Sequence, residues 1–319
     1  MSNYTVAPAP HVHGGDSVKK NMLNVIIALM PAYLAGIWYF GVGALIVSCV
    51  AMASCVAFEW LISKFLLKKQ PQINDLSALL TGLLLGMNLP SSLPWWMVVI
   101  GSLIAIGIGK MSFGGLGNNL FNPALVGRVF LLISFPAAMT TWPIPAPFTF
   151  DGSVDALTAA TPLSYIKESI FTTFSNAEMA LGEIGGSLGE TSSVALLLGL
   201  VYLLATRTIS WHIPVSILGT VLIFTGIMHG IDPCTYASPL LHITSGGLLL
   251  GSIFMATDYV TSPMTKTGQI IFGVGIGLIT MVIRLFGSYP EGISFAILIM
   301  NAVVPLINRY IRPKRFGAK

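Results

Sequence analysis

Charged residues are scarce in this chain, which has 16 Lys and Arg and 12 Asp and Glu among its 319 residues, a share of 9%. Soluble globular domains carry about 25%. Hydrophobic residues make up 54% of the chain, and the mean hydropathy is +0.82. So few charges cannot cover the surface of a soluble fold, and so much apolar surface excludes intrinsic disorder. The composition therefore predicts an integral membrane protein.

Cysteine is nearly absent as well. The three cysteines, Cys49, Cys55 and Cys234, form no Cys-x-x-Cys pair, which argues against an iron–sulfur ligand set and against a disulfide framework. A dinucleotide-binding glycine fingerprint is also missing. Residues 1–21 are polar, and the apolar stretch after them is a full span without a small-residue cleavage site, so we expect no signal peptide.

Ten apolar stretches are candidate membrane spans, since a helix needs about 20 apolar residues to cross a bilayer. The clear candidates are 22–41, 42–62, 94–110, 119–138, 193–206, 212–229, 268–286 and 291–309. Two more stretches, 76–89 and 243–257, are short and interrupted by Gly or Pro. We therefore expect an all-α integral membrane protein with about ten transmembrane helices.

The basic residues divide unevenly between the two sides of these spans. With the N-terminus inside, 13 of the 16 Lys and Arg fall in cytoplasmic segments, and only Lys167 falls outside. This positive-inside pattern predicts cytoplasmic termini. The net charge of +4 then reflects topology, and we expect no nucleic-acid partner.

The two short stretches resemble each other, because residues 82–86 and residues 247–251 both read GLLLG. Each belongs to the third span of a five-span half, and an odd number of spans inverts the second half relative to the first. We expect two inverted five-helix repeats, 22–138 and 193–309, with a short broken third helix in each and a site at their interface. The alternatives are chance and close helix packing at glycines.

One long loop, residues 139–192, is predicted outside, and the tails 1–21 and 310–319 are predicted in the cytoplasm. Within the loop, Thr161 precedes Pro162, which is typical of an N-cap followed by the first helical residue. The free N–H groups of that helix start favour an anion at Thr161. The alternative is a capped amphipathic helix that lies on the membrane surface.

The same loop carries a recognisable motif. Residues 155–161, DALTAAT, fit the pattern Asp-x-x-(Ser/Thr)-(Gly/Ala)-Ala-Thr, at which a flavin transferase attaches FMN to the last Thr. Other family-like segments are APAPHVHGGDSVKKNM at 7–22, NNLFNPALVGR at 118–128, FMATDYVTSPMT at 254–265 and YPEGISFAILIMNAVVPLINR at 289–309. Over essentially its whole length the chain resembles the D subunit of the Rnf ion-translocating ferredoxin:NAD oxidoreductase complex. It is similar, more distantly, to the B subunit of the Na⁺-translocating NADH:quinone reductase.

The resemblance implies a membrane flavoprotein subunit of a redox-driven pump for Na⁺ or H⁺ between ferredoxin and NAD, in a bacterial or archaeal cytoplasmic membrane. FMN would be bound covalently at Thr161, and the positions around the attachment point are Asp155, Thr158, Ala160, Pro162 and Leu163. The commoner family form reads Ser-Gly-Ala-Thr, whereas this chain has Thr-Ala-Ala-Thr at 158–161. Partner subunits, both membrane and peripheral, would supply the NADH, ferredoxin and cluster chemistry, and a flavin transferase would mature the chain.

The resemblance also implies a second, non-covalent flavin, riboflavin in the relatives, near Asn119 and Asn122. These two residues lie three apart at the start of a predicted span, so we expect them to share a helix face. Their amides can hydrogen-bond the edge of a flavin ring. Helix capping and interfacial packing are the alternative roles.

Ionisable residues in or near the spans are further candidates. Arg128 either neutralises a reduced flavin or a neighbouring acid, or extends to the headgroups. Asp258 follows the second short stretch and either caps a helix or lines a cation path. Glu59 is expected to pair with Lys64. No metal site and no catalytic residue is predicted.

A protein of another class, a permease or channel for ions or small polar solutes, shares the inverted architecture. Few charges in the spans line an obvious path for such solutes. A purely structural scaffold for the complex is a third interpretation, and it leaves the motif at Thr161 without a role.

Overall fold

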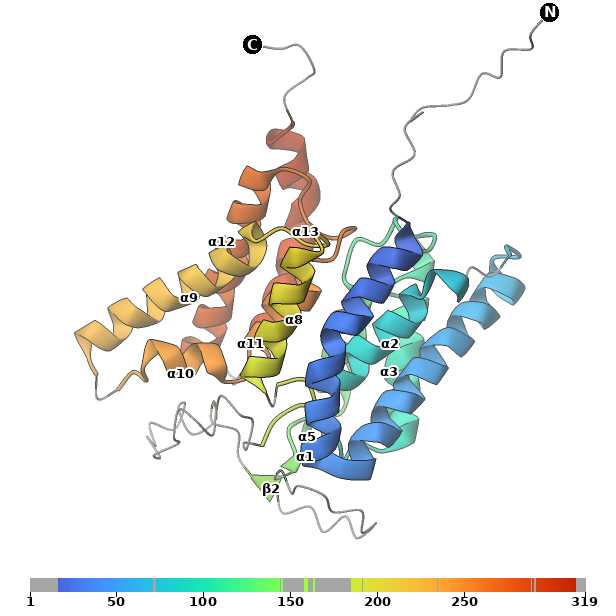
Figure 1. Cartoon of the computed structure of the whole chain (residues 1–319), viewed down its shortest axis with the longest axis horizontal. Helices are drawn as coiled ribbons and strands as arrows, with labels where there is room; N and C mark the ends of the chain where they lie inside the picture. The colour runs from blue at the N-terminus through green and yellow to red at the C-terminus, as the bar shows by residue number, and fades with distance from the viewer. Residues whose placement is uncertain are drawn as a thin grey trace, which may run out of the picture.

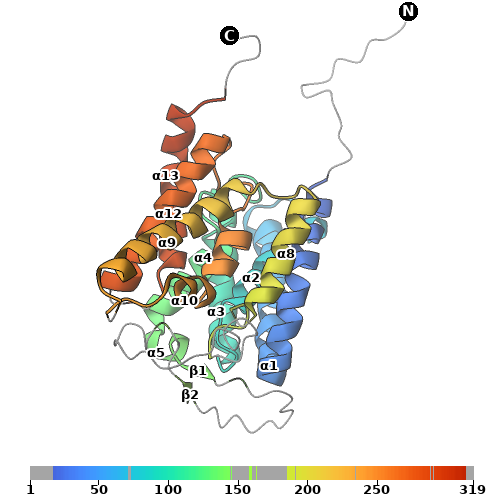
Figure 2. The ribbon, with the colours of Figure 1, turned by 60° about the vertical axis from the view of Figure 1, so that its left-hand side comes forward.

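The structure is a computed structural model, and it describes residues 17–70, 73–143, 145, 158–159, 163, 185–190, 192–233, 235–287, 289 and 291–313. Helices dominate this part of the chain, in agreement with the prediction (Figure 1). The blue-to-green helices of the first part lie beside the yellow-to-red helices of the second (Figure 1). Both described ends lie at the same end of the molecule in both ribbon views (Figure 2).

The first helix, α1 (Val18–Leu61), consists of two arms. Gly41 interrupts it with φ 61° and ψ −143°, and the chain folds back there (Figure 1). A positive φ is easily adopted only by Gly, so this residue ends the first arm. The arms correspond to the predicted spans 22–41 and 42–62. A π-helical turn, η1 (Ile62–Leu66), extends the second arm.

Short helices complete the first part of the chain. They are η2 (Ile73–Asp75), α2 (Ser77–Met87), α3 (Trp95–Gly107), η3 (Met111–Phe113), α4 (Pro123–Ser134) and α5 (Pro136–Met139). Nearly every residue of α2 is buried, because this helix packs against α1 on one side and α4 on another. The apolar GLLLG segment therefore lies inside the protein.

The second part of the chain contains three long helices, α9, α12 and α13, and several shorter elements. Its elements are α8 (Ser193–Ala205), α9 (His212–Ile231), α10 (Pro239–Thr244), α11 (Leu248–Leu250), the π-helical η4 (Gly251–Met255), α12 (Lys266–Phe286) and α13 (Ile293–Tyr310). Helix α12 packs between α9 and α13, and α8 packs against α1. The described strands are β1 (Trp142–Pro143) and β2 (Thr158–Ala159), which pair antiparallel.

Five helical stretches are long and apolar enough to cross a membrane: Val18–Leu66, Trp95–Phe113, His212–Ile231, Lys266–Phe286 and Ile293–Tyr310. The first of them runs through both arms of α1. Three apolar helices, Ser77–Met87, Pro123–Ser134 and Ser193–Ala205, are shorter. This pattern is that of a multi-pass membrane protein.

Two predicted spans have different boundaries in the structure. The stretch 119–138 is helical only from Pro123, and Pro136 starts a separate turn because its ring cannot continue α4. The stretch 243–257 is divided by Gly246, whose φ of 71° separates α10 from α11, in agreement with the predicted broken helix. The break predicted in 76–89 is wrong, because α2 runs without interruption from Ser77 to Met87. The helix predicted from Thr161 onward lies outside the described residues.

Candidate functional site

A pocket opens between the two parts of the chain, with an empty volume of about 730 Å³ that includes its mouth. We call it the inner pocket. Much of its wall is apolar, with Leu80 and Leu84 from α2, Leu203 from α8 and Phe254 from η4. Its polar side chains are those of Ser77, Thr81, Lys110, Asn119, Asn122, Thr257, Asp258 and Tyr259. An apolar cleft with a few convergent polar groups is typical of a site for an organic cofactor.

Asn122 is the N-cap of α4. Its Oδ1 accepts hydrogen bonds from the N–H groups of Ala124 (3.1 Å) and Leu125 (3.4 Å). Its Nδ2 donates to the carbonyl oxygen of Met255, at the end of η4, over 3.1 Å. Both ends of the amide are therefore engaged in structure, and the capping role left open by the sequence is confirmed.

Asn119 lies in the connection before α4, so the prediction that it shares a helix face with Asn122 is wrong. The reason is that Pro123 takes the first helical position and leaves Asn119 outside the helix. Asn119 is 6% exposed, and its Nδ2 donates to Phe121 O over 3.2 Å. Its Oδ1 is buried and has no hydrogen-bond partner in the described part of the chain. The two asparagines nevertheless line one pocket.

Lys110 supplies a buried ion pair in the wall of this pocket. Its Nζ lies 2.8 and 2.7 Å from the two carboxylate oxygens of Glu59 and 2.6 Å from Ser77 Oγ. The expected pairing of Glu59 with Lys64 is wrong, because Lys64 turns outward and its Nζ lies 4.6 Å from the centre of the Trp60 ring. Sequence proximity favoured Lys64, whereas helix packing brings Lys110 to Glu59.

Asp258 lies at the pocket wall, directly after η4 and Ala256–Thr257. Its Oδ2 accepts from Thr261 Oγ1 over 3.2 Å, so it stabilises the turn that follows. Burial raises the pKa of this carboxyl above its usual value. A local capping role is thus visible, and the predicted role in a cation path stays a prediction.

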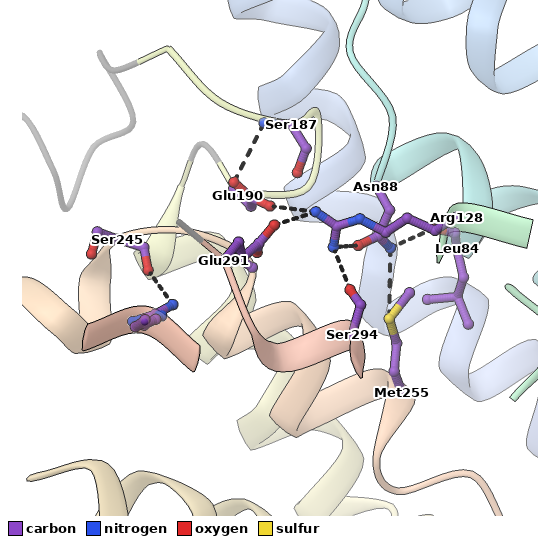
Figure 3. A network of polar contacts seen from close by, with 11 residues as sticks. Leu84, Asn88, Arg128, Ser187, Glu190, Ser245, Met255, Glu291 and Ser294 are labelled. Carbon is purple, nitrogen blue, oxygen red and sulfur yellow. Dashed lines mark hydrogen bonds and ion pairs between the residues drawn. The ribbon is translucent and has the colours of Figure 1, made fainter. Parts of the chain in front are cut away.

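Arg128 joins the two parts of the chain in a second polar cluster, which we call the junction network (Figure 3). Its Nη1 donates to Asn88 Oδ1 at 2.8 Å, at the end of α2, and to Ser294 Oγ at 2.9 Å, in α13. Its Nη2 is bonded to the Glu291 carboxylate. Arg128 is 4% exposed, so it neutralises a neighbouring acid and does not extend to the headgroups.

A second carboxylate completes the junction network. Glu190 Oε1 lies 3.7 Å from Arg128 Nη2, and the N–H of Gly189 donates to Met87 O over 2.7 Å, which fixes this loop to the end of α2. The Gly247 N–H donates to Glu291. A Cβ at Gly247 would overlap Glu291 Oε1 and lie 3.0 Å from Glu190 Oε1, so any side chain there would displace the Glu291 carboxylate.

The flavin motif is only partly described. The backbone of Thr158 and Ala159 forms β2 and pairs with β1, while Asp155, Ala160, Thr161 and Pro162 lie outside the described residues. Leu163 is 5% exposed and packs against Gly246. Leu163, two residues after the motif, therefore contacts the chain next to the junction network.

A known protein family matches this chain over almost its whole length. The model of the NQR2, RnfD, RnfE family matches residues 5–317. The chain belongs to this family.

Relatives in the NQR2, RnfD, RnfE family cover nearly the whole chain. A Clostridium ljungdahlii protein, named as the D subunit of a proton-translocating ferredoxin:NAD⁺ oxidoreductase complex, is 46% identical over 99% of this chain and 97% of its own length. The D subunit of a complex named for Na⁺ translocation, from Acetobacterium woodii, is 46% identical over 99% and 96%. The D subunit of a Stutzerimonas stutzeri ion-translocating oxidoreductase complex is 42% identical over 95% and 93%. The predicted resemblance is confirmed.

Several residues of the inner pocket and of the junction network were not predicted from the sequence. Glu190 falls in the predicted loop 139–192, Glu291 begins the predicted span 291–309, and Lys110 ends the predicted span 94–110, and the sequence assigns none of them a role. The signal that could have found Lys110 was Glu59 within an apolar span, since a buried acid needs a partner. For the junction network no comparable signal exists, because its members lie far apart in the sequence.

Proposed function

We propose that this chain is the D-type membrane subunit of an ion-translocating ferredoxin:NAD oxidoreductase complex, and that it relays electrons through FMN on Thr161 and a second flavin. Two relatives that are 46% identical over 99% of the chain are named as D subunits of ion-translocating ferredoxin:NAD⁺ oxidoreductase complexes. A third, 42% identical over 95% of the chain, is named as the D subunit of an ion-translocating oxidoreductase complex. The DALTAAT motif at 155–161 supplies the attachment residue. The combination of full-length identity and this motif carries the proposal.

The inner pocket supports a site for the second flavin. The edge of a flavin ring presents N–H and carbonyl groups, and Asn119 Oδ1 is a buried acceptor without a hydrogen-bond partner among the described residues. Leu84, Leu203 and Phe254 provide apolar surface for the ring. The residues present therefore fit such a group. When bound, the flavin supplies the electron-accepting ring, and the protein supplies position and excludes water.

A correspondence between two basic residues supports the inverted repeat. Lys110, just after α3, donates to Ser77, the first residue of α2. Arg284, near the end of α12, donates to the carbonyl oxygens of His242 (2.6 Å) and Ser245 (3.1 Å), just before α11. In each half a buried basic residue of the fourth predicted span thus binds the start of the short third one. We place both termini in the cytoplasm and Thr161 outside on the charge pattern.

The covalent flavin is tested by co-expressing the chain with its flavin transferase and viewing a denaturing gel under ultraviolet light. We expect a fluorescent band for the native chain and none for Thr161→Ala. Thr158→Ser is the matched control, because it changes a threonine of the same motif but keeps the motif pattern and the attachment residue. A native band without fluorescence, or a band that survives Thr161→Ala, would favour the permease interpretation.

A further inference from the structure

Two largely buried carboxyl groups meet in the junction network. Glu190 and Glu291 both lie against Nη2 of Arg128 and beside Gly247 (Figure 3). Their side chains are 7% and 17% exposed. Two carboxylates that share one buried site repel each other when both are ionised, which favours a proton on one of them.

Among the described residues, few charged groups lie around this pair. Arg128 faces it from α4, and Arg284 faces it from α12. Burial and the neighbouring Arg284 charge lower the pKa of His242 in α10 to about 4, so this imidazole is neutral. Asn88 and Ser294 contribute uncharged polar groups through Arg128. With both acids ionised the cluster of two arginines and two glutamates is neutral, so one bound proton changes its charge to +1.

The two carboxyl groups are held unequally. Glu291 accepts from the Arg128 guanidinium and from the Gly247 N–H. Glu190 Oε2 has only a 3.5 Å contact with the Ser187 N–H, and no N–H or hydroxyl donor among the described residues reaches its Oε1. Arg128 already donates to Asn88, Ser294 and Glu291. The buried carboxylate oxygen that lacks such a donor therefore belongs to Glu190.

This difference sets the order of ionisation. Burial and the Glu291 charge raise the pKa of Glu190 to about 8, against the pull of Arg128. Burial also opposes ionisation of Glu291, but Arg128, Arg284 and the Gly247 N–H outweigh it and lower the pKa of that carboxyl. Glu291 is thus the constant anion, and Glu190 is the group whose charge changes.

We infer that Glu190 and Glu291 form a proton-binding site in which Glu190 holds a proton against the ionised Glu291, at the contact between the two parts of the chain. The partial exposure of Glu291 gives the proton a route of exchange. Loss of the proton adds a second anion beside Arg128. The charge of the pair therefore changes the electrostatic environment of Arg128, the residue of α4 that bonds Asn88 at the end of α2 and Ser294 in α13. This site goes beyond the proposed electron transfer and needs no flavin.

The test is infrared difference spectroscopy on the purified full chain in detergent, over a pH series centred on about 8. The carbonyl-stretch band of a protonated carboxylic acid should disappear with a midpoint near that pH. Glu190→Gln should remove this titrating band. Glu291→Gln should keep it but weaken proton binding about tenfold, because the neighbouring negative charge is gone.

The matched control is Asp258→Asn, since Asp258 is another buried acid whose pKa is raised. This variant should leave the band and its midpoint unchanged. A titrating band that persists in Glu190→Gln, or no titrating band in the native chain, overturns the assignment. If Glu190→Gln does not fold, the comparison of Glu291→Gln with Asp258→Asn decides, because equal midpoints in both would also overturn it. None of these outcomes depends on flavin attachment.

Discussion

At the scale of single residues, identical side chains in one pocket have different tasks. Both amide ends of Asn122 are used, in the α4 cap and in the bond to Met255. Asn119 keeps a buried oxygen without a partner among the described residues. The sequence showed only two asparagines three apart. Which of them caps α4, and which lies outside the helix, depends on where Pro123 starts the helix.

We expect Asn119→Ala to weaken the non-covalent flavin about tenfold, since one hydrogen bond in a desolvated site is worth roughly 1–1.5 kcal/mol. Acid extraction of the purified chain, followed by chromatography of the released flavin, measures the occupancy. Asn122→Ala is the control: it should lower thermal stability by about 1 kcal/mol through loss of the cap. Equal flavin loss in both variants would argue against a special role for Asn119.

The Lys110–Glu59 pair permits a second prediction at this scale. Lys110→Met leaves the Glu59 carboxylate buried without its counter-ion, which costs about 3–5 kcal/mol. The double variant Lys110→Met, Glu59→Gln removes both charges and should recover most of that loss. Thermal unfolding in detergent measures both. Additive losses in the double variant would show that the pair is not coupled.

At the scale of elements, most helices could be predicted from apolar length. The spans 212–229 and 268–286 correspond closely to α9 (His212–Ile231) and α12 (Lys266–Phe286). An interruption of 243–257 was predicted from its glycines, but the backbone geometry at the break was not, because the φ of 71° at Gly246 is accompanied by tertiary contacts with Leu163 and Arg284. Hydropathy reports where a chain is apolar, and it does not report where the backbone must turn.

The break in α1 gives a prediction for an element. Gly41→Ala places a side chain at φ 61°, ψ −143°, and we expect a loss of about 1–3 kcal/mol in unfolding free energy. Gly219→Ala is the matched control, because this glycine lies within α9 and a Cβ there meets nothing within 4 Å. Its effect should be neutral or slightly stabilising. A similar loss in both variants would mean that the positive φ is not the cause.

At the scale of the whole molecule, the sequence predicted two halves but not what joins them. Glu190 lies in the predicted loop and Glu291 at the start of a predicted span, but their burial and their common partner Arg128 follow from packing. Residues 128 and 291 are 163 positions apart, and only the folded chain brings them together. The contact between the halves is therefore polar and sensitive to protonation at this point.

This sensitivity should be visible in the stability of the folded chain. The pKa of Glu190 is raised in the fold to about 8 from 4.5, so between these values the folded state binds a proton that the unfolded state has lost. The stability linked to this proton is fully present below about 4.5 and is lost as the pH rises through about 8, with a slope of at most about 1.4 kcal/mol per pH unit. Glu190→Gln removes the titrating carboxyl group and with it this pH dependence of the stability. Thermal unfolding of both chains in detergent should give melting temperatures that fall with rising pH more steeply for the native chain than for Glu190→Gln. Parallel curves would show that Glu190 does not titrate in this range.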